Sequence, residues 1–219
     1  MKEHEVHHFD TVEFREAINL YDSSFPPNEN TTRPIGMVVE MLKRDENYHL
    51  YASLNHNKVV GILLMYVFRS LRIGLLDYIA VHREYQGRRI GKRLFEFTLE
   101  KLKSEVTNPT GILIEVQKVN AVSPHERNLR ERRLKFYITM GAKIMDRVNY
   151  IFPPIQSGFS SEEMYLMIRP LAELHSLPKE SVVRYIHAIY STIYQYHGKD
   201  FNSTYEKLPA RIILLNFTS

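Results

Sequence analysis

One stretch of the chain, residues 86–92, combines two glycines, an amide and three cationic side chains directly after an apolar run. A helical spacing of apolar residues begins at once. A helix N-terminus offers unsatisfied N–H groups and about half a positive charge, which suits a phosphate group. Glycine lets a ligand approach the backbone, and Arg or Lys adds charged donors. The stretch Gln86-Gly87-Arg88-Arg89-Ile90-Gly91-Lys92 therefore predicts a pyrophosphate-binding loop.

Three familiar motifs do not fit. The loop lacks the Gly-Lys-Ser/Thr ending of a Walker sequence and the three spaced glycines of a dinucleotide fingerprint. Residues 4–8, His-Glu-Val-His-His, match the zinc-protease pattern His-Glu-x-x-His, but that chemistry needs a buried helix and a third ligand. We expect neither at this position. We predict a polar lead-in to a first strand or helix, and no metal cofactor.

The elements that must position the loop follow from the apolar periodicity, which alternates between helix and strand. Helical spacing covers residues 10–24, 35–44, 91–103, 125–140 and 179–197. Strand patterns cover residues 48–54, 59–68, 71–81, 112–116, 143–152, 163–168 and 211–217. This order predicts an α/β fold. We predict one domain over residues 1–171, with a C-terminal helix–strand extension over residues 172–219 packed on that same domain, because 48 residues are too few for a separate core.

The composition is that of an ordinary globular protein, with 44% hydrophobic and 25% charged residues. No run of about 20 apolar residues indicates a membrane span, and the charged start predicts a cytoplasmic protein. The absence of cysteine excludes disulfides and thiol catalysis. The net charge of +4 does not require nucleic acid. Basic clusters within residues 83–93 and 127–135 could still attract phosphates, although a solvated helix face explains each equally well.

The loop and its setting resemble the GNAT superfamily of GCN5-related N-acetyltransferases. The family signature, Gln/Arg-x-x-Gly-x-Gly/Ala, follows a central strand, as Gln86–Gly91 follows Ile79-Ala80-Val81 here. Arg89 stands where the family has glycine, and it could adopt helical angles and bind phosphate itself. The order of elements over residues 9–170 also follows the family. The resemblance implies a mixed, strongly twisted central sheet flanked by helices, and acetyl-CoA as co-substrate.

The resemblance also implies which residues bind this co-substrate. The backbone N–H groups near Ile79, Ala80 and Val81 would polarise the thioester carbonyl. The pyrophosphate would lie on the loop and the start of the next helix. The implied contacts there are Gln86, Gly87, Arg88, Arg89, Ile90, Gly91 and Lys92.

The catalytic groups are implied in the same way. Tyr137, four residues before Gly141, would protonate the departing CoA thiolate, although it could merely pack its helix. Transfer to a neutral amine needs a base, and the candidates are Asp77 and Glu115, each inside an apolar strand where a bare charge is costly. The alternative for each carboxylate is a salt bridge or an exposed strand end.

Weaker candidates for the acceptor site are Glu29 and Tyr150. One further position departs from the family pattern, because Arg130 occupies the place where the family often has asparagine.

The leading hypothesis is an N-acetyltransferase that moves acetyl from acetyl-CoA directly to a small-molecule or peptide amine. The acidic candidates hint at a cationic acceptor. An alternative is a CoA-binding regulatory module with impaired catalysis, which Arg89 and Arg130 favour. A nucleic-acid-binding protein is a third reading without a recognisable motif. The C-terminal extension could cover the acceptor cleft, form a homodimer contact or simply pack the core.

Overall fold

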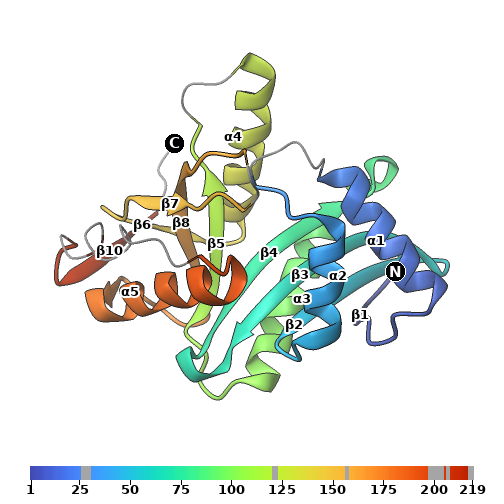
Figure 1. Cartoon of the computed structure of the whole chain (residues 1–219), viewed down its shortest axis with the longest axis horizontal. Helices are drawn as coiled ribbons and strands as arrows, with labels where there is room; N and C mark the ends of the chain where they lie inside the picture. Colours follow the sequence, from blue (N-terminus) through green and yellow to red (C-terminus); the bar gives the residue numbers. More distant parts are fainter. Residues whose placement is uncertain (26–30, 120–122, 156–157, 197–204, 206–207, 217–219) are drawn as a thin grey trace. The chain divides into compact units, whose positions relative to one another are not determined.

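The computed structural model describes residues 1–25, 31–119, 123–155, 158–196, 205 and 208–216. The chain forms two compact units, residues 1–109 and residues 110–219 (Figure 1). Each unit contains an antiparallel sheet and helices, so the class is mixed α/β, as predicted. Within the described ranges, no helix is both long enough and apolar enough to span a membrane.

The first unit is built on a four-stranded meander in which each strand pairs antiparallel with the next along the chain. The long strands β2 and β3 are almost wholly buried, and β3 has no charged or polar-amide residue after Lys58, as expected for a strand covered on both faces. The strands are β1 (Lys2–Glu5), β2 (Tyr48–Asn55), β3 (Lys58–Phe68) and β4 (Ile73–Val81).

Helices cover both faces of this sheet: α1 (Val12–Ser24) and α2 (Ile35–Arg44) lie in front and α3 (Ile90–Glu105) behind (Figure 1). The ring of Tyr78 meets the ring of Tyr21 in α1 at 4.9 Å between centroids. On the opposite face, a Cβ added to Gly61 would come within 2.8 Å of the Ile90 side chain in α3. Glycine at position 61 therefore allows α3 to pack closely against β3.

A β-bulge interrupts β4 at Asp77. Leu64 pairs with Tyr78 and Met65 pairs with Leu76, so Asp77 is the extra residue on its strand. A bulge re-aims a side chain that would otherwise follow the strict alternation of the strand. Three-residue turns of 3-10 helix at Arg69–Leu71 and Arg83–Tyr85 bracket β4, which begins at Ile73 rather than at residue 71.

The described strand pairs within the second unit are antiparallel. Its strand order is β5-β8-β6-β10-β9, and β7 also pairs with β8. The strands are β5 (Gly111–Gln117), β6 (Lys143–Met145), β7 (Tyr150–Phe152), β8 (Glu162–Pro170), β9 (Ser176–Pro178) and β10 (Arg211–Leu215). The helices are α4 (Pro124–Thr139), α5 (Lys179–Ala188) and a turn of π-helix, η3 (Ile189–Ile193).

The strand predicted over residues 143–152 is wrong in its middle, because it is two strands separated by residues 146–149. Arg147 adopts a left-handed φ of 58°, which a continuous strand does not allow. The Asp146 N–H instead donates to the Ile213 carbonyl of β10 at 2.9 Å. The break lets β6 join β10, while β7 returns to β8.

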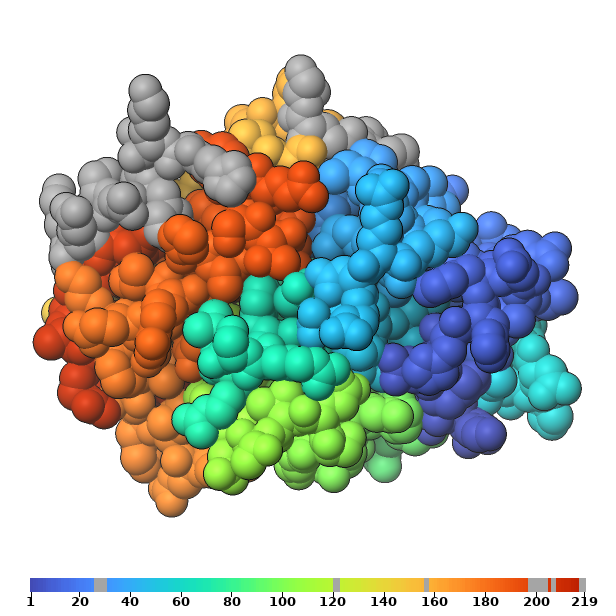
Figure 2. Space-filling view, turned by 60° about the horizontal axis from the view of Figure 1, so that its bottom comes forward, coloured from blue at the N-terminus to red at the C-terminus, as the bar shows by residue number. Residues whose placement is uncertain are grey.

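The C-terminal extension contains the predicted helix and final strand, and the short strand β9, which the sequence did not indicate, precedes the helix. α5 continues into η3, and the apolar face predicted from Val182, Ile186, Ile189 and Ile193 is buried. Figure 2 shows α5, in orange, at the surface of the second unit. β10 pairs with both β6 and β9, so the extension is part of the sheet of this unit.

Candidate active site

The predicted phosphate loop leads from β4 into α3 through a 3-10 turn. The Gln86 side-chain amide donates to the Val81 carbonyl at 3.1 Å, which ties the loop back to the end of the strand. The first hydrogen bond of the helix runs from the Arg93 N–H to the Arg89 carbonyl at 3.1 Å. Within this fully described stretch, no backbone carbonyl accepts from the N–H groups of residues 87–92. These six donors form the N-terminal group that an anion can use.

The backbone of the loop is left-handed at two positions. Gly87 has φ +77° with no atom within 4 Å of an added Cβ, so its conformation rather than crowding requires glycine. Arg89 has φ 61° and ψ 17° and is the residue that caps α3. The expected helical angles of Arg89 are therefore wrong. A left-handed residue with a side chain costs about 1–2 kcal/mol, a cost that glycine at this position would avoid.

The side chains of the loop are mostly exposed and cationic. Arg88 lies over the ring of Tyr85, with 5.1 Å between its guanidinium carbon and the ring centroid. Lys92 lies 3.6 Å from Glu96 one turn later in α3. Arg93, the last member of the basic cluster, instead pairs with Glu3 of β1 at 2.9 Å. The exposed residues Arg83, Arg88, Arg89 and Lys92 are left as the positive surface around the loop.

The end of β4 presents part of its backbone away from β3. The His82 N–H donates to the Val60 carbonyl of β3 at 2.9 Å. Because alternate residues of an antiparallel strand direct their backbone groups to opposite sides, the N–H groups of Val81 and Ile79 point away from β3. The Val81 carbonyl that accepts from Gln86 agrees with this orientation. Ala80 lies between them, buried and paired with Ile62 of β3.

Asp77, one of the two predicted bases, is the centre of a buried ion pair in the first unit. Its two oxygens accept from the Arg33 guanidinium at 2.5 and 2.6 Å, and from the Tyr48 hydroxyl. The side chains of Arg33 and Asp77 are 1% and 3% exposed. Burial alone would lower the pKa of Arg33, but the charge of Asp77 raises that pKa well above its usual value. The Arg33 guanidinium therefore remains charged beside Asp77.

Arg33 is the functional-site neighbour that the sequence did not indicate. It follows two threonines and precedes a proline in a polar stretch, so no periodicity predicts a buried side chain there. The only available signal was indirect: a carboxylate inside an apolar strand must have a cation or a donor when it is buried. The Arg33 N–H also donates to the Tyr78 hydroxyl at 3.0 Å, which fixes the backbone beside the ion pair.

Glu115, the second predicted base, lies on β5 in a different environment. Its carboxylate accepts from the Tyr150 hydroxyl and, at 2.5 Å, from the Tyr194 hydroxyl. Burial, followed by the charge of Glu115, raises the pKa of Tyr150 well above its usual value, so this phenol stays protonated. Among the residues that the structure describes, two neutral donors thus contact Glu115, where a guanidinium contacts Asp77. Tyr150, a weaker candidate from the sequence, is one of them.

Tyr137 lies near the end of α4 in the second unit and is 8% exposed. Burial raises the pKa of Tyr137 to about 12, although the charge of Arg133 opposes that shift. A phenol with this pKa is fully protonated at neutral pH and can serve only as a proton donor. Gly141, just beyond the helix, has φ +82° and ends α4 as the sequence predicts.

The basic cluster of α4 is smaller than its sequence indicates. Arg130 is buried and bonds Glu126 at 2.6 Å and Glu162 at 2.9 Å. Arg133 donates to the Gln117 side chain at 2.7 Å. Two of its cations therefore stabilise the fold. A shallow hollow of about 530 Å³ follows the remaining face of α4, lined by His125, Asn128, Leu129, Glu131, Arg132 and Lys135.

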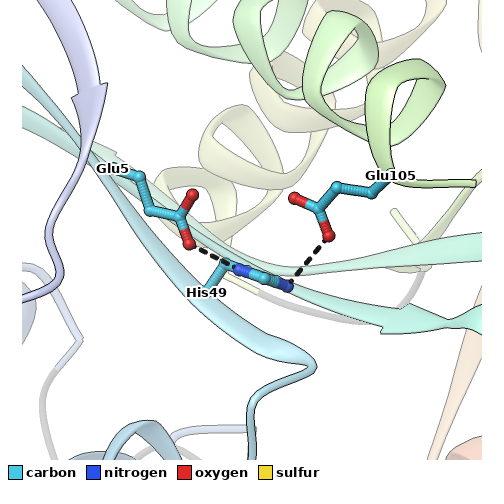
Figure 3. A group of neighbouring side chains, drawn as sticks. All are labelled: Glu5, His49 and Glu105. Carbon is cyan, nitrogen blue, oxygen red and sulfur yellow. Dashed lines mark hydrogen bonds and ion pairs between the residues drawn. The ribbon is translucent and has the colours of Figure 1, made fainter.

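A separate cluster in the first unit has the composition of a metal site. Glu5, His49 and Glu105 bring their ligand atoms within 4.8 Å of one another (Figure 3). The His49 Nδ1 atom lies 2.6 Å from Glu5, and the His49 Nε2 atom lies 3.5 Å from Glu105. The motif His-Glu-x-x-His contributes only Glu5 here, because its first residues form the strand β1 and not a helix.

Cations already surround this cluster. Arg69 pairs with Glu105 at 2.9 Å, and Lys101 lies 3.8 Å from Glu5. Burial opposes ionisation of Glu5, but the hydrogen bond and charge of His49 outweigh it and lower the pKa of the Glu5 carboxyl. Imidazole between two carboxylates, with two further cations outside, balances the charge without an ion. We therefore read the cluster as an ion-pair network that joins β1, β2 and α3.

Comparison with known proteins identifies the family. The model of the acetyltransferase (GNAT) family matches residues 14–128, more than half of the chain. The chain belongs to the GNAT family. As a GNAT protein it is an acyltransferase of the N-acetyltransferase class. The resemblance stated from the sequence is confirmed. No curated protein matches the sequence significantly.

Solved structures confirm the GNAT fold. A Bacteroides thetaiotaomicron protein assigned to the GNAT family is 20% identical with a TM-score of 0.69, covering 90% of this chain and 100% of its own. The ribosomal-protein-S18-alanine N-acetyltransferase of Escherichia coli is 18% identical with a TM-score of 0.54, covering 79% and 95%. An aminoglycoside 6'-N-acetyltransferase complexed with coenzyme A is 15% identical with a TM-score of 0.59, covering 80% and 99%.

The roles of individual residues in this GNAT protein stay predictions. The loop Gln86–Lys92 and the carboxylates Asp77 and Glu115 have the geometry given above. Glu29 lies outside the described residues.

Proposed function

We propose that this chain transfers an acetyl group from acetyl-CoA directly to an amine. The observation that carries the proposal is the group of six unbonded N–H donors at residues 87–92, at the start of α3. Such a group, with Arg88, Arg89 and Lys92 around it, fits the pyrophosphate of CoA. Bound there, acetyl-CoA supplies an activated acyl group as a thioester.

The backbone of β4 supplies the electrophilic assistance in this proposal. The N–H groups of Ile79 and Val81 point away from β3, so either can donate to the thioester oxygen as negative charge develops on it. A fixed donor of this kind typically contributes about 10²–10³-fold in rate. This role needs no side chain, which is consistent with the apolar residues at both positions.

Glu115 is the better candidate for the base. To accept a proton, Asp77 would have to leave the buried guanidinium of Arg33 uncompensated, which costs several kcal/mol. Glu115 is held by the hydroxyls of Tyr150 and Tyr194, and neutral donors oppose protonation far less than a cation does. We therefore assign proton removal from the acceptor ammonium to Glu115, and positioning to Asp77.

Tyr137 is the proposed acid. The amine nitrogen forms a bond to the acyl carbon, the carbon–sulfur bond breaks, and the leaving thiolate takes the Tyr137 proton. The pKa of about 12 keeps this proton on Tyr137 until the thiolate forms. Glu115 holds the first proton, which it takes from the ammonium before attack. The second proton, which the nitrogen loses as the amide forms, returns to the Tyr137 phenolate, so the products are a neutral amide and a free thiol.

The alternative is a regulatory module that binds CoA without turnover. The left-handed Arg89 favours it, because a side chain stands at a position that a close phosphate contact would leave to glycine. Arg130 does not add to it, since this residue is engaged with Glu126 and Glu162. The two readings differ only in catalysis.

The test is release of free thiol from acetyl-CoA with a panel of primary amines, for the wild-type protein and for Tyr137→Phe and Glu115→Gln. Turnover that both variants lose, while acetyl-CoA still binds to them, supports the proposal. Binding without turnover of any amine supports the regulatory module. Turnover that both variants retain in full would contradict the assigned roles.

A further inference from the structure

The segment that leads into α2, residues 31–33, is tied to β4 through two consecutive residues of that strand. The Asp77 carboxylate accepts from the Arg33 guanidinium at 2.5 and 2.6 Å. The Tyr78 hydroxyl donates to the Thr31 carbonyl at 2.9 Å and accepts from the Arg33 N–H at 3.0 Å. Two neighbouring side chains of β4 thus hold both the backbone and the side chain of this segment.

The β-bulge of β4 makes this double contact possible. Consecutive residues of a regular strand point to opposite faces of the sheet, yet Asp77 and Tyr78 both contact Arg33. Asp77 is the extra residue of the bulge, so its side chain can turn toward the face that Tyr78 occupies. The Tyr21 ring of α1 packs on the Tyr78 ring at this face, which α1 and α2 cover (Figure 1).

Tyr78 and Arg33 also contact α1, on the other side of the connection between α1 and α2. The Phe25 ring, at the end of α1, meets the Tyr78 ring with 4.9 Å between centroids. The Tyr21 hydroxyl donates to the Arg33 carbonyl at 2.8 Å. Burial raises the pKa of Tyr78 to about 12, against the charge of Arg33, so the Tyr78 hydroxyl keeps its proton. The side chains of Tyr21, Arg33, Asp77 and Tyr78 are defined here as the β4 clamp.

The clamp is buried, and stability alone does not require such a polar group. Tyr21 and Arg33 are each 1% exposed, and Tyr78 is 7% exposed. Apolar side chains of similar volume would avoid the cost of burying these charges and hydroxyls. A buried polar network, however, rigidifies its surroundings, because each donor must meet its own acceptor. The clamp therefore fixes the position of β4 more narrowly than apolar packing would.

The clamp ends at the residue before Ile79, whose N–H points away from β3. The bulge leaves Asp77 without a partner residue on β3, so the ladder alone does not fix the backbone between Leu76 and Tyr78. The Ile79 N–H belongs to the planar peptide unit that starts at the Tyr78 Cα atom, and its direction follows that atom. A backbone donor assists catalysis only when it is held where negative charge develops.

We propose that Arg33 and Tyr78 are positioning residues that aim the Ile79 N–H at the thioester of acetyl-CoA. Asp77 joins them at the bulge, and Tyr21 holds the same segment from α1. The proposal rests on the proposed function, because it concerns the donor of that reaction. The connection between α1 and α2 thereby sets the geometry of a backbone group on β4, and with it the rate of acyl transfer.

The experiment compares the wild-type protein with Tyr78→Phe, which keeps the ring and removes only the hydroxyl. Its readout is the infrared band of bound acetyl-CoA that is isotope-labelled at the acetyl carbonyl, because a hydrogen bond to the thioester oxygen lowers the frequency of this band. In Tyr78→Phe we expect the band nearer its position in solution. We also expect kcat to fall about tenfold and the dissociation constant of acetyl-CoA to stay unchanged. Tyr21→Phe should move the band and kcat in the same direction by less.

Tyr66→Phe is the matched control. Tyr66 is also 7% exposed, and its hydroxyl donates to Asp45 at 2.9 Å, outside the clamp. This variant loses a hydrogen bond of the same kind and should keep the wild-type band and kcat. Amide hydrogen exchange of the free proteins tests the clamp without a ligand. Residues 76–79 should exchange about tenfold faster in Tyr78→Phe and at the wild-type rate in Tyr66→Phe.

The outcomes separate this proposal from the proposed function. An unmoved band in Tyr78→Phe overturns the proposal, with or without a fall in kcat, even if the wild-type protein acetylates an amine. An equal loss of kcat in Tyr66→Phe overturns it too, because any buried hydroxyl would then have the same effect. Equal exchange in all three proteins overturns the clamp itself. If the wild-type protein binds no acetyl-CoA, faster exchange confined to Tyr78→Phe supports the clamp, and the failure belongs to the proposed function alone.

Discussion

Asp77 and Glu115 occur in similar sequence contexts but have different partners in the structure. Each interrupts an apolar strand, yet Asp77 meets a buried guanidinium and Glu115 meets phenols. A cation fixes the charge of its carboxylate, whereas neutral donors solvate the charge and leave it able to take a proton. Glu5, held by the imidazole of His49, is intermediate. The partner therefore decides whether a buried carboxylate supports the fold or can do chemistry.

The largest expected effect is on turnover. Glu115→Gln should lower kcat by about 10²–10⁴-fold while the protein remains folded, because it removes the proposed base and retains the volume and one oxygen that accepts from a phenol. Steady-state rates of thiol release and a thermal melt measure the two properties. A Glu115→Gln variant with wild-type kcat would contradict the assignment of Glu115 as the base, and with it the contrast with Asp77.

Asp77→Asn should instead act on stability. It leaves the Arg33 guanidinium buried without its counter-charge, so the free energy of unfolding should fall by about 3–5 kcal/mol. Urea unfolding measures this change. The double variant Arg33→Met/Asp77→Leu removes both charges and should lose less than the single variant does. A single variant as stable as the wild type would show that the ion pair does not support the fold.

Tyr137→Phe tests whether the Tyr137 hydroxyl is the general acid. It removes only the hydroxyl, and we expect kcat to fall by about 10²-fold with little change in the dissociation constant of acetyl-CoA. The deficit should shrink with an acyl donor whose leaving group is less basic and needs no proton. An equal deficit with both donors would indicate that Tyr137 only packs its helix.

The pH dependence of stability tests the role of Glu5, the intermediate case. Its folded pKa lies below the ordinary value, so its contribution to stability is present above about pH 4.5 and is lost as the pH falls through the folded pKa. Glu5→Gln should cost about 1.5 kcal/mol at pH 7 and progressively less in acid. Unfolding curves from pH 7 to pH 3 measure the difference. A constant difference over this range would contradict the ion-pair reading of the cluster.

The smallest effect concerns Arg89. Arg89→Gly removes a left-handed side chain, so the protein should gain about 1 kcal/mol of stability. It also removes one cation from the loop, so CoA should bind a few-fold more weakly. Thermal melts and titration measure the two changes, which oppose each other. Loss of stability would mean that the Arg89 side chain makes a contact that outweighs its strain.

The sequence predicted what depends on local pattern. The strand–loop–helix order around Gln86–Lys92, the helix end at Gly141 and the apolar face of α5 all follow from spacing or from a residue with special backbone freedom. The partners of Asp77 and Glu115 could not be predicted, because Arg33 and Tyr194 lie 44 and 79 residues away from them. The left-handed backbone at Arg147 was also hidden, since any polar residue could occupy a strand at that position. Long-range pairing decides these features.

The most direct test of the account is calorimetric titration of acetyl-CoA into the wild-type protein and an Arg88→Glu/Lys92→Glu variant. The variant Lys43→Glu/Arg44→Glu, at the exposed end of α2, makes the same change in net charge away from the loop. We predict micromolar binding to the wild type and to this control, and at least tenfold weaker binding to the loop variant. Equal affinity of all three proteins, or no binding at millimolar acetyl-CoA, would contradict the assignment of the loop as the CoA site.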